Sequence, residues 1–377
     1  MKKLTTCQLG DLIEFKNGKA IKPNNGIVPI YGGNGILGYS SEFNAERSLI
    51  VGRVGAYCGS VFFEKKKFWV SDNAILGVPK NSINAEYAYY LLKQLDLNSK
   101  HVGSSQPLLT QGILNSLKVS IYKDLLTQQK IAQVLSTLDR KIALNQQINA
   151  ELEKMAKTLY DYWFVQFDFP DENGNPYKSS GGEMVYNPEL KRDVPKGWEV
   201  KKLGEIADLY QPKTLSENEL LENGKYLVYG ANGIIGRYDE FNHEQSVVAI
   251  ACRGNSCGTI NITQPFSWIT GNAMVVKPKE NNVSVDFIKN LLAISNIEKC
   301  ISGSAQPQIT RTNLSPLLMV YPPKDMLEKY SEITHKYFNQ RINTLHQNTQ
   351  LTQLRDFLLP MLMNGQVEVD SLDFASN

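Results

Sequence analysis

The longest regular pattern of apolar and polar positions lies between about residues 124 and 163. Apolar side chains recur there at steps of three and four, while Gln, Lys, Asp and Glu occupy most other positions. Such steps place the apolar residues on one stripe of a helix. They are Ile131, Leu135, Leu138, Ile142, Ile148, Leu152, Met155 and Leu159. Because no Gly or Pro interrupts the stretch, it predicts one helix of about 55–60 Å, at about 1.5 Å per residue.

A second stretch of this kind runs from about residue 325 to 363. Its apolar residues are Leu327, Ile333, Phe338, Ile342, Leu345, Leu351, Leu354, Leu358 and Met361. Pro360 is expected to kink or end this helix in its last turn. Since so long a stripe needs a partner of similar length, the two stretches predict a coiled coil within one molecule. Asn145 occupies a stripe position, where it either fixes the register or is a partly exposed polar residue.

The stretches that precede the two helices repeat one another. Tyr31–Gly38 returns as Tyr229–Gly236, and Glu42–Asn44 returns as Glu240–Asn242. The other matched pairs are Leu9–Ile13 with Leu203–Ala207, Arg53 with Arg253, Trp69–Ala74 with Trp268–Ala273, and Gly103–Thr110 with Gly303–Thr310. The chain therefore contains one unit twice, a globular domain followed by a long helix.

We expect an α+β fold, with two similar globular domains separated by two long helices that form an antiparallel intramolecular coiled coil. The predicted boundaries are a first domain at 1–122, a long helix at 123–163, a connector at 164–195, a second domain at 196–323, a long helix at 324–363 and a tail at 364–377. Short apolar runs predict strands, among them residues 60–63 and 68–70. Asn84 is the predicted N-cap of a helix over residues 84–95.

Composition and charge limit the classes of function. With a net charge of +2 over 377 residues, a nucleic-acid surface must come from local clusters of charge. The five Cys form no C-x-x-C pair, which argues against a zinc site or a disulfide framework. No apolar run approaches the roughly 20 residues of a membrane span. We expect a cytoplasmic protein that contacts no membrane.

The sequence offers no motif for catalysis. Gly33, Gly35 and Gly38 match a dinucleotide fingerprint, but no helix is predicted after them and the copy has Ala231 at the first position. We interpret this stretch as a loop in which Gly supplies a positive φ. The four His are scattered, and no P-loop sequence is present. The sequence therefore predicts no catalytic group, no metal ligand and no cofactor in this chain.

The repeated loops share a chemistry that suits DNA. Asn and Gln pair with adenine edges, Arg pairs with guanine, and Ser or backbone N–H groups bind phosphate. The candidates in the first domain are Lys19, Tyr31, Asn34, Arg53, Ser104, Ser105 and Gln106. The candidates in the second domain are Lys213, Tyr229, Asn232, Arg253, Asn255, Ser304, Gln306, Gln308 and Arg311. Each is also compatible with a solvated turn, as is Lys65–Lys67, which predicts a basic hairpin tip.

Three stretches carry a resemblance to a known family. They are Gly103–Pro107, the run Gln129–Ala132 that continues to Leu138 and Asp139, and the connector from Trp163 to Trp198. Together with the order of domains, they resemble the specificity subunits of type I restriction-modification systems over nearly the whole chain. The second helix departs from this pattern, since Lys329–Glu332 stands where the first helix has Gln129–Ala132.

The resemblance implies that each globular domain is a target-recognition domain that reads one half of a split site in double-stranded DNA. It also implies that the helices act as a spacer and bind two methyltransferase subunits, through Gln129, Lys130, Asp139 and Arg140. S-adenosylmethionine, Mg²⁺ and ATP are then expected only in partner subunits, including a restriction subunit where the system has one. The chain itself would be a non-catalytic subunit.

Two other classes of function stay open on the sequence. The chain could be a coiled-coil adaptor whose paired domains bind protein. It could also be part of an enzyme that carries its own methyltransferase or nuclease, although no motif for either is present. An adenine methyltransferase gene beside this one would favour the specificity subunit.

Overall fold

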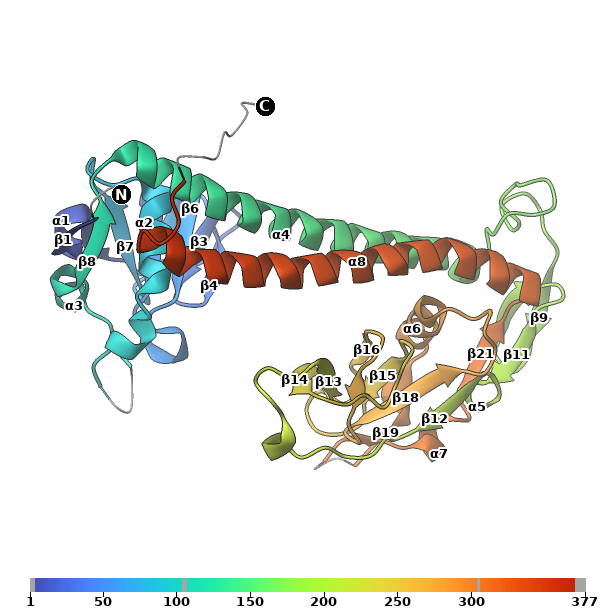
Figure 1. The fold of residues 1–377 in the computed structure, drawn as a ribbon. Coiled ribbons are helices and arrows are strands. Elements are labelled where there is room, and N and C mark those ends of the chain that lie inside the picture. The colour runs from blue at the N-terminus through green and yellow to red at the C-terminus, as the bar shows by residue number, and fades with distance from the viewer. Residues whose placement is uncertain (1–3, 104–106, 304–305, 370–377) are drawn as a thin grey trace. The chain divides into compact units, whose positions relative to one another are not determined.

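The computed structural model of the chain describes residues 4–103, 107–303 and 306–369. It divides into two compact units, the first formed by residues 1–145 and 347–377 and the second by residues 146–346. Both boundaries fall inside the long helices α4 (Leu125–Tyr160) and α8 (Lys324–Met363). Each unit therefore consists of one globular domain and one part of each long helix (Figure 1).

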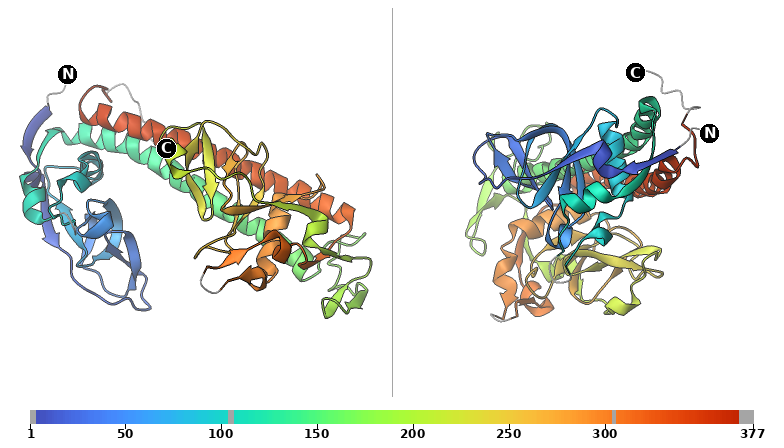
Figure 2. Two further views of the ribbon diagram at one scale, coloured as in Figure 1. Left: turned by 90° about the horizontal axis from the view of Figure 1, so that it is seen from below. Right: turned by 90° about the vertical axis from the view of Figure 1, so that its left-hand side faces the viewer.

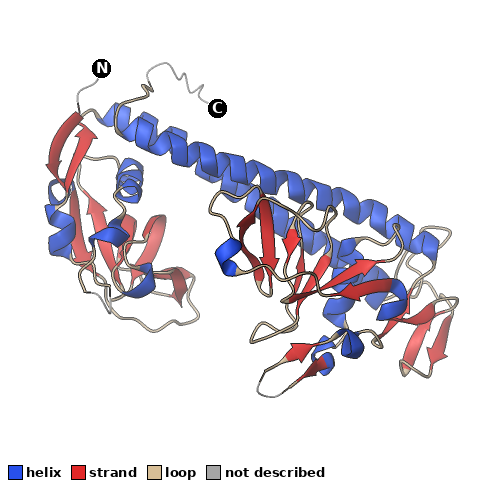
Figure 3. Ribbon diagram, turned by 60° about the horizontal axis from the view of Figure 1, so that its bottom comes forward, coloured by secondary structure: helices blue, strands red, loops and turns tan. Residues whose placement is uncertain are grey.

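The first domain is built on a six-stranded sheet (Figure 3). The strand order is β2 (Ile13–Asn17), β7 (Ala74–Pro79), β5 (Ala45–Gly52), β6 (Val61–Val70), β3 (Val28–Gly32) and β4 (Gly35–Ser40). Neighbours are antiparallel except β3 and β6, which are parallel. The remaining elements are β1 (Leu4–Gln8) paired with β8 (Lys118–Tyr122), the helices α1 (Leu9–Leu12), α2 (Ala85–Gln94) and α3 (Gln111–Ser116), and 3₁₀ turns at Gly55–Tyr57 and Leu97–Lys100.

The second domain repeats this topology with its main sheet divided in two. One sheet has the order β12 (Ala207–Tyr210), β18 (Ala273–Pro278), β15 (Val248–Ala251) and β16 (Ile260–Ile262). The other has the order β14 (Gly233–Tyr238), β13 (Tyr226–Gly230) and β17 (Trp268–Ile269). Around them lie β11 (Glu199–Lys202) paired with β21 (Leu318–Tyr321), β19 (Ile301–Ser302) paired with β20 (Gln308–Ile309), α5 (Leu203–Ile206), α6 (Val285–Ile294), α7 (Arg311–Leu314), and 3₁₀ turns at Glu217–Glu219 and Ile297–Cys300. The repeat predicted from the sequence is therefore a repeat of structure.

One strand of the first domain corresponds to two strands of the second. The unbroken β6 runs through residues 61–63 of one predicted segment and through 68–70 of the other. In the second domain, β16 and β17 are separated by a stretch that contains Pro265. Proline has no N–H to donate to a ladder, so it interrupts the strand. The prediction that Lys65–Lys67 forms a hairpin tip is wrong, because these residues lie inside β6. Lys65 pairs there with Glu86, and Lys67 lies 4.2 Å from the centre of the Phe43 ring.

In each unit the segments of α4 and α8 run side by side and antiparallel (Figure 2). In the first unit Asn145 Nδ2 donates to Asn348 Oδ1 (2.9 Å). In the second unit the Tyr330 hydroxyl donates to the carbonyl of Ala156 (3.2 Å). Because lower numbers in α4 face higher numbers in α8, the pairing is antiparallel, as predicted. Asn145 is buried, which favours the interpretation that it fixes the register. Helix α8 ends three residues after Pro360.

The connector attaches the end of α4 to the second domain through aromatic side chains. Helix α4 passes into a π-helical turn at Asp161–Val165, and a hairpin of β9 (Met184–Asn187) and β10 (Arg192–Pro195) follows. The Phe164 ring lies 5.0 Å from the ring of Tyr330 on α8 and 5.2 Å from that of Phe287 on α6. These rings join both helices to the core of the second domain.

The core of the first unit is joined to both helices in a similar way. Ile131 and Leu135 of α4 and Leu362 of α8 are buried in one apolar cluster with the residues of the globular domain. A polar contact adds to it: Tyr90 of α2 donates to Asp139 Oδ2 (2.6 Å), and Arg355 of α8 donates to Asp139 Oδ1 (2.7 Å). Burial and the neighbouring carboxylate raise the pKa of Tyr90, so its hydroxyl stays protonated as the donor.

Replacing Arg355 by Ala is expected to lower the free energy of unfolding of the first unit by about 1.5–3 kcal/mol, the range for hydrogen bonds to charged groups. The change leaves the half-buried Asp139 carboxylate without its guanidinium partner. Urea denaturation of the two proteins measures the difference. Arg140→Ala is the matched control on α4, because Arg140 is exposed and, among the described residues, donates to Ser136 and Thr137 of its own helix. Equal losses in the two variants would contradict the role given to Asp139.

Candidate nucleic-acid interface

The loops that carry the predicted DNA contacts are fixed to one another by backbone hydrogen bonds. In the first domain Arg53 N donates to Asn73 O (3.0 Å), and Leu109 N donates to Arg53 O (2.9 Å). In the second domain Cys252 N donates to Asn272 O (3.1 Å), and Ile309 N donates to Cys252 O (3.0 Å). In the first domain, the segment after β5 thus lies between the loop before β7 and the segment before α3. In the second domain, the segment after β15 lies between the loop before β18 and the segment before α7.

These bonds correct the predicted match between Arg53 and Arg253. The bonding pattern places Cys252, and not Arg253, where the first domain has Arg53. Isolated bridges agree, since Val54 pairs with Leu108 while Arg253 pairs with Gln308. The sequence match was therefore shifted by one residue, and such a shift moves a side chain to the opposite face of an extended chain.

The two arginines consequently differ in surroundings. Arg53 is half-buried, and its Nε lies buried without a hydrogen-bond partner among the described residues. Arg253 is exposed. Arg253 is therefore the more exposed of the two side chains, and Arg53 is the more closely packed.

Arg253→Ala is expected to weaken DNA binding by roughly 1–3 kcal/mol, with little change in stability, because the side chain is exposed. Arg53→Ala is expected to lower stability more than Arg253→Ala does, because its side chain is packed. Melting temperatures and DNA titrations of the two variants, each assembled with the methyltransferase partner, give the comparison. A larger stability loss in Arg253→Ala, with unchanged DNA affinity, would contradict this assignment.

The paired tyrosines Tyr31 and Tyr229 make polar contacts within their domains, and Tyr31 is half-buried whereas Tyr229 is buried. The Tyr31 hydroxyl donates to Glu64 Oε2 (2.9 Å), and burial together with that carboxylate raises the pKa of Tyr31. Tyr229 is only 5% exposed, and its hydroxyl accepts from Gln264 N (3.1 Å). We correct the prediction for Tyr229, because the domain buries it. Tyr31 is half-buried and stays a prediction, with its hydroxyl already bonded to Glu64. The matched Tyr marks a packing position.

Asn34 and Asn232 are exposed at the tips of the hairpins β3–β4 and β13–β14. The Gly that follows each Asn has a positive φ, +87° at Gly35 and +94° at Gly233. The pairing of Gly32 with Gly35 and of Gly230 with Gly233 places this Gly directly after the two turn residues, where glycine adopts a positive φ without steric cost. The prediction that the Gly-rich loop needs a positive φ is confirmed, and neither Asn amide has a hydrogen bond to another described residue.

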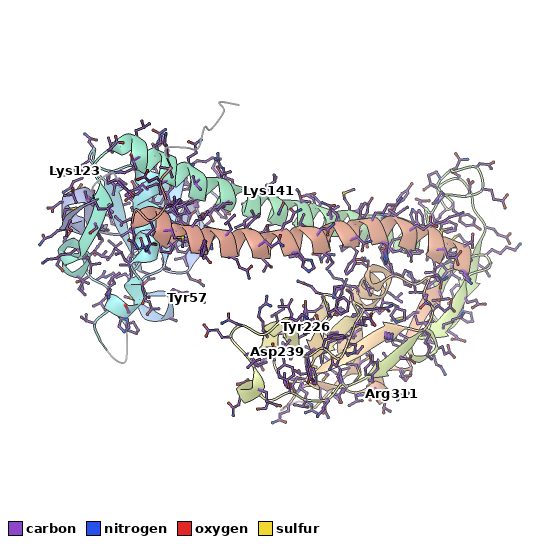
Figure 4. All side chains as sticks on the ribbon, viewed as in Figure 1. Tyr57, Lys123, Lys141, Tyr226, Asp239 and Arg311 are labelled. Atoms are coloured by element: carbon purple, nitrogen blue, oxygen red, sulfur yellow. The ribbon has the colours of Figure 1, made fainter. Side chains whose placement is uncertain are left out.

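The other candidates are exposed or lie outside the described residues. Lys19 and Lys213 follow β2 and β12, and both are exposed, as are Asn255, Gln306, Gln308 and Arg311. Arg311 lies on α7, at the end of the second domain opposite to α8 (Figure 4). Ser104, Ser105, Gln106 and Ser304 lie outside the described residues. Arg253, Gln308 and Arg311 line one recess of about 360 Å³.

Sequence analysis missed three exposed side chains beside these loops. Tyr57 lies on the 3₁₀ turn that follows Arg53 (Figure 4), and Tyr210 and Gln211 line the recess of the second domain. The sequence could have indicated Tyr57, because it is an aromatic residue in a Gly-rich loop close to Arg53, a predicted DNA contact. Tyr210 and Gln211 carried no local signal, because they reach the recess only through the pairing of β12 with β18.

The predicted partner-binding residues lie in the first unit on α4. Gln129 and Arg140 are exposed, and Lys130 is half-buried. Asp139 is held by Tyr90 and Arg355, so its carboxylate is engaged within the molecule. Exposed apolar side chains accompany them on the helices, since Leu144 is 49% and Phe357 is 59% exposed.

Within residues 4–103, 107–303 and 306–369, no group of three or more His, Cys, Asp or Glu is placed to hold a metal ion. Over the same residues no helix combines the length and apolar character that crossing a membrane requires.

The chain is similar to proteins of one family throughout. Residues 1–154 and 195–354 match the model of the type I restriction modification DNA specificity domain. The type I restriction enzyme MjaIX specificity subunit of Methanocaldococcus jannaschii is 29% identical over 321 residues, which cover 78% of this chain and 72% of the relative. A putative type I specificity subunit of Mycoplasma genitalium is 23% identical over 96% of this chain and 94% of its own length. The crystal structure of a type I restriction-modification system S subunit from M. genitalium shares the fold, with a TM-score of 0.61, 20% identity and 96% coverage of each chain.

Proposed function

This chain belongs to the family of type I restriction-modification specificity subunits, which are non-catalytic, and we propose that it reads a bipartite site in double-stranded DNA. Each of its two target-recognition domains contacts one half-site. The observation that carries this proposal is the structural repeat: two domains of one topology each present an exposed Asn at a hairpin tip and exposed polar residues in adjoining loops. A two-fold repeat of a reader suits a site with two halves.

The helices are proposed to bind two methyltransferase subunits and, where the system has one, a restriction subunit. Phe357 and Leu144 are candidates for this contact, because both are large apolar side chains that stay exposed on the helices. Gln129, Lys130 and Arg140 stay predictions for the same surface. S-adenosylmethionine, Mg²⁺ and ATP belong to the partner subunits in this proposal, and the complex acts on DNA in the cytoplasm.

Reconstitution tests the proposal. The purified chain, a purified methyltransferase subunit of the same system, and their mixture are each given DNA and labelled S-adenosylmethionine. Sequence-specific methylation is expected from the mixture alone, because the chain supplies recognition and the partner supplies chemistry. Methyl transfer by the chain alone, or no complex between the two proteins, would contradict the proposal. The adaptor alternative predicts instead that the mixture and the methyltransferase alone methylate the same sequences.

A further inference from the structure

The recess of the second domain combines an apolar floor with charged donors at its rim. It opens where β12, the loop after β15, β20 and α7 meet. Leu209, Met274 and Ile309 form the floor and are all buried. Arg253 and Arg311 stand at the rim with exposed side chains, and no ion pair among the described residues involves either guanidinium. The recess therefore offers two sets of N–H donors above a surface that water contacts poorly.

The backbone that carries these arginines is held in place. Thr310 caps α7, since its hydroxyl accepts from Asn313 N (3.2 Å), so Arg311 is the first residue of that helix. Gly254 N donates to Pro307 O (3.2 Å), which ties the loop of Arg253 to the segment before β20. The positions of the two arginines are thus fixed before any ligand arrives.

Tyr210 forms a wall of the recess whose orientation is also fixed. Its ring stacks on His243 with centroids 5.9 Å apart and an angle of 8°, and its hydroxyl lies 2.8 Å from His243 Nε2. His243 Nδ1 lies 2.6 Å from Asn242 Oδ1, an acceptor that also receives Ile269 N. Nδ1 therefore carries the proton, and Nε2 accepts from Tyr210. Burial lowers the pKa of His243, which keeps this neutral arrangement.

The first domain has different chemistry at the same place. When the two domains are aligned by their hydrogen bonds, Val54 corresponds to Arg253, Leu108 corresponds to Gln308, and Gln111 corresponds to Arg311. With its amide oriented to satisfy its neighbours, Gln111 donates to Phe15 O (3.2 Å) and accepts from Asn17 N (2.9 Å). The first domain therefore presents apolar side chains and an inward-bonded amide, whereas the second presents guanidinium groups.

We infer that this recess reads a guanine in the half-site of the second domain, with Arg311 or Arg253 donating to O6 and N7 of the base. Arg to these two acceptors is the commonest specific contact in the major groove. The exposed guanidinium groups at the rim can meet the edge of a base in the groove, where the ring itself stays stacked in the duplex. Tyr210 and Gln308 border that edge, and at the positions that correspond to Arg253 and Arg311 the first domain has Val54 and Gln111. The inference rests on the proposed function.

Methylation mapping of variants tests it. The full chain is co-expressed with its methyltransferase, and methylated adenines are mapped across the genome for the wild type, Arg311→Ala, Arg311→Lys and Arg253→Ala. Gln111→Ala is the control, because it changes the matching position of the first domain. Lysine keeps the positive charge but cannot form the bidentate hydrogen bonds of arginine. Arg311→Lys should therefore lose base reading while it retains attraction to phosphate. Melting temperatures of the purified complexes identify any variant that fails to fold.

Exchanging the second domain for that of another family member identifies the half-site that this domain reads. The wild-type motif is expected to require G at one position of that half-site. In one of the two Ala variants, preference for G at that position should fall roughly tenfold to hundredfold, the range of one bidentate pair. Where that variant is Arg311→Ala, Arg311→Lys should lose the preference as well. The other half-site should stay unchanged. Uniformly weaker methylation with an unchanged motif would show a phosphate contact, and full activity with an unchanged motif would show an unused recess; either result overturns the inference. A wild-type complex without a bipartite motif would instead overturn the proposed function.

Discussion

Inserting four residues into both long helices is expected to lengthen the gap between the half-sites by one or two base pairs, without changing the half-sites. Four residues add about 6 Å to a helix, and B-DNA rises about 3.4 Å per base pair. The insertions belong next to Asn145 in α4 and next to its partners Gln347 and Asn348 in α8. They should preserve the alternation of three and four apolar steps, so that the stripes still face each other.

The structure gives this prediction an internal control. Arg355 pairs with Asp139 in the first unit, and Arg341 pairs with Glu153 in the second unit. An insertion in α4 alone shifts one of these pairings by four residues relative to the other, so it should destabilise the protein and lower methylation. Mapping of methylated sites reads out both variants. Altered half-sites with the original gap would show that the helices do not measure it.

Exchanging residues 196–323 for the second domain of another family member is expected to replace one half-site completely and leave the other intact. The structure explains why the domain is separable: Glu199 of β11 pairs with Tyr321 of β21, so the chain enters and leaves at the same place. The first domain has the same construction, with Leu4 of β1 opposite Tyr122 of β8.

The exchanged domain must still fit the aromatic cluster that joins it to the helices. Phe287 of the domain packs against Tyr160, Phe164 and Tyr330. A donor domain with Phe at this position should keep the stability of the parent, whereas Phe287→Ala should cost about 3–5 kcal/mol, the range for a buried Phe. A change in both half-sites after the exchange would show that the two domains do not read independently.

The sequence alone predicted the features that depend on local pattern. The apolar steps identified both long helices, and α4 begins and ends within a few residues of the predicted bounds. Asn84 caps α2 as predicted, since its side chain accepts from Tyr87 N. The duplicated motifs identified the repeat because several of them fix backbone geometry. The Asn44 side chain bonds both the N–H and the C=O group of Val70, and the Asn242 side chain does the same with Ile269.

The errors concern features that only the folded chain determines. The predicted match between Arg53 and Arg253 was wrong by one residue. The backbone hydrogen bonds of Cys252 define the structural alignment, and identical residue types do not. Tyr229 was predicted on a loop surface, yet the domain buries it. The recess around Arg311 could not be predicted, because it joins residues that are about a hundred positions apart in the sequence. Several matched motifs mark shared scaffolding, as Asn44 and Asn242 do, whereas the recess around Arg311 lies at positions that differ between the domains.

A genome-wide map of methylated adenines, in cells that express this chain with its methyltransferase, is the direct test of bipartite recognition. We expect one motif made of two short, different half-sites, separated by a constant number of unspecified base pairs. The half-sites should differ because the matched positions differ, as Leu108 and Gln308 do. A single continuous motif, or methylation without sequence preference, would contradict it.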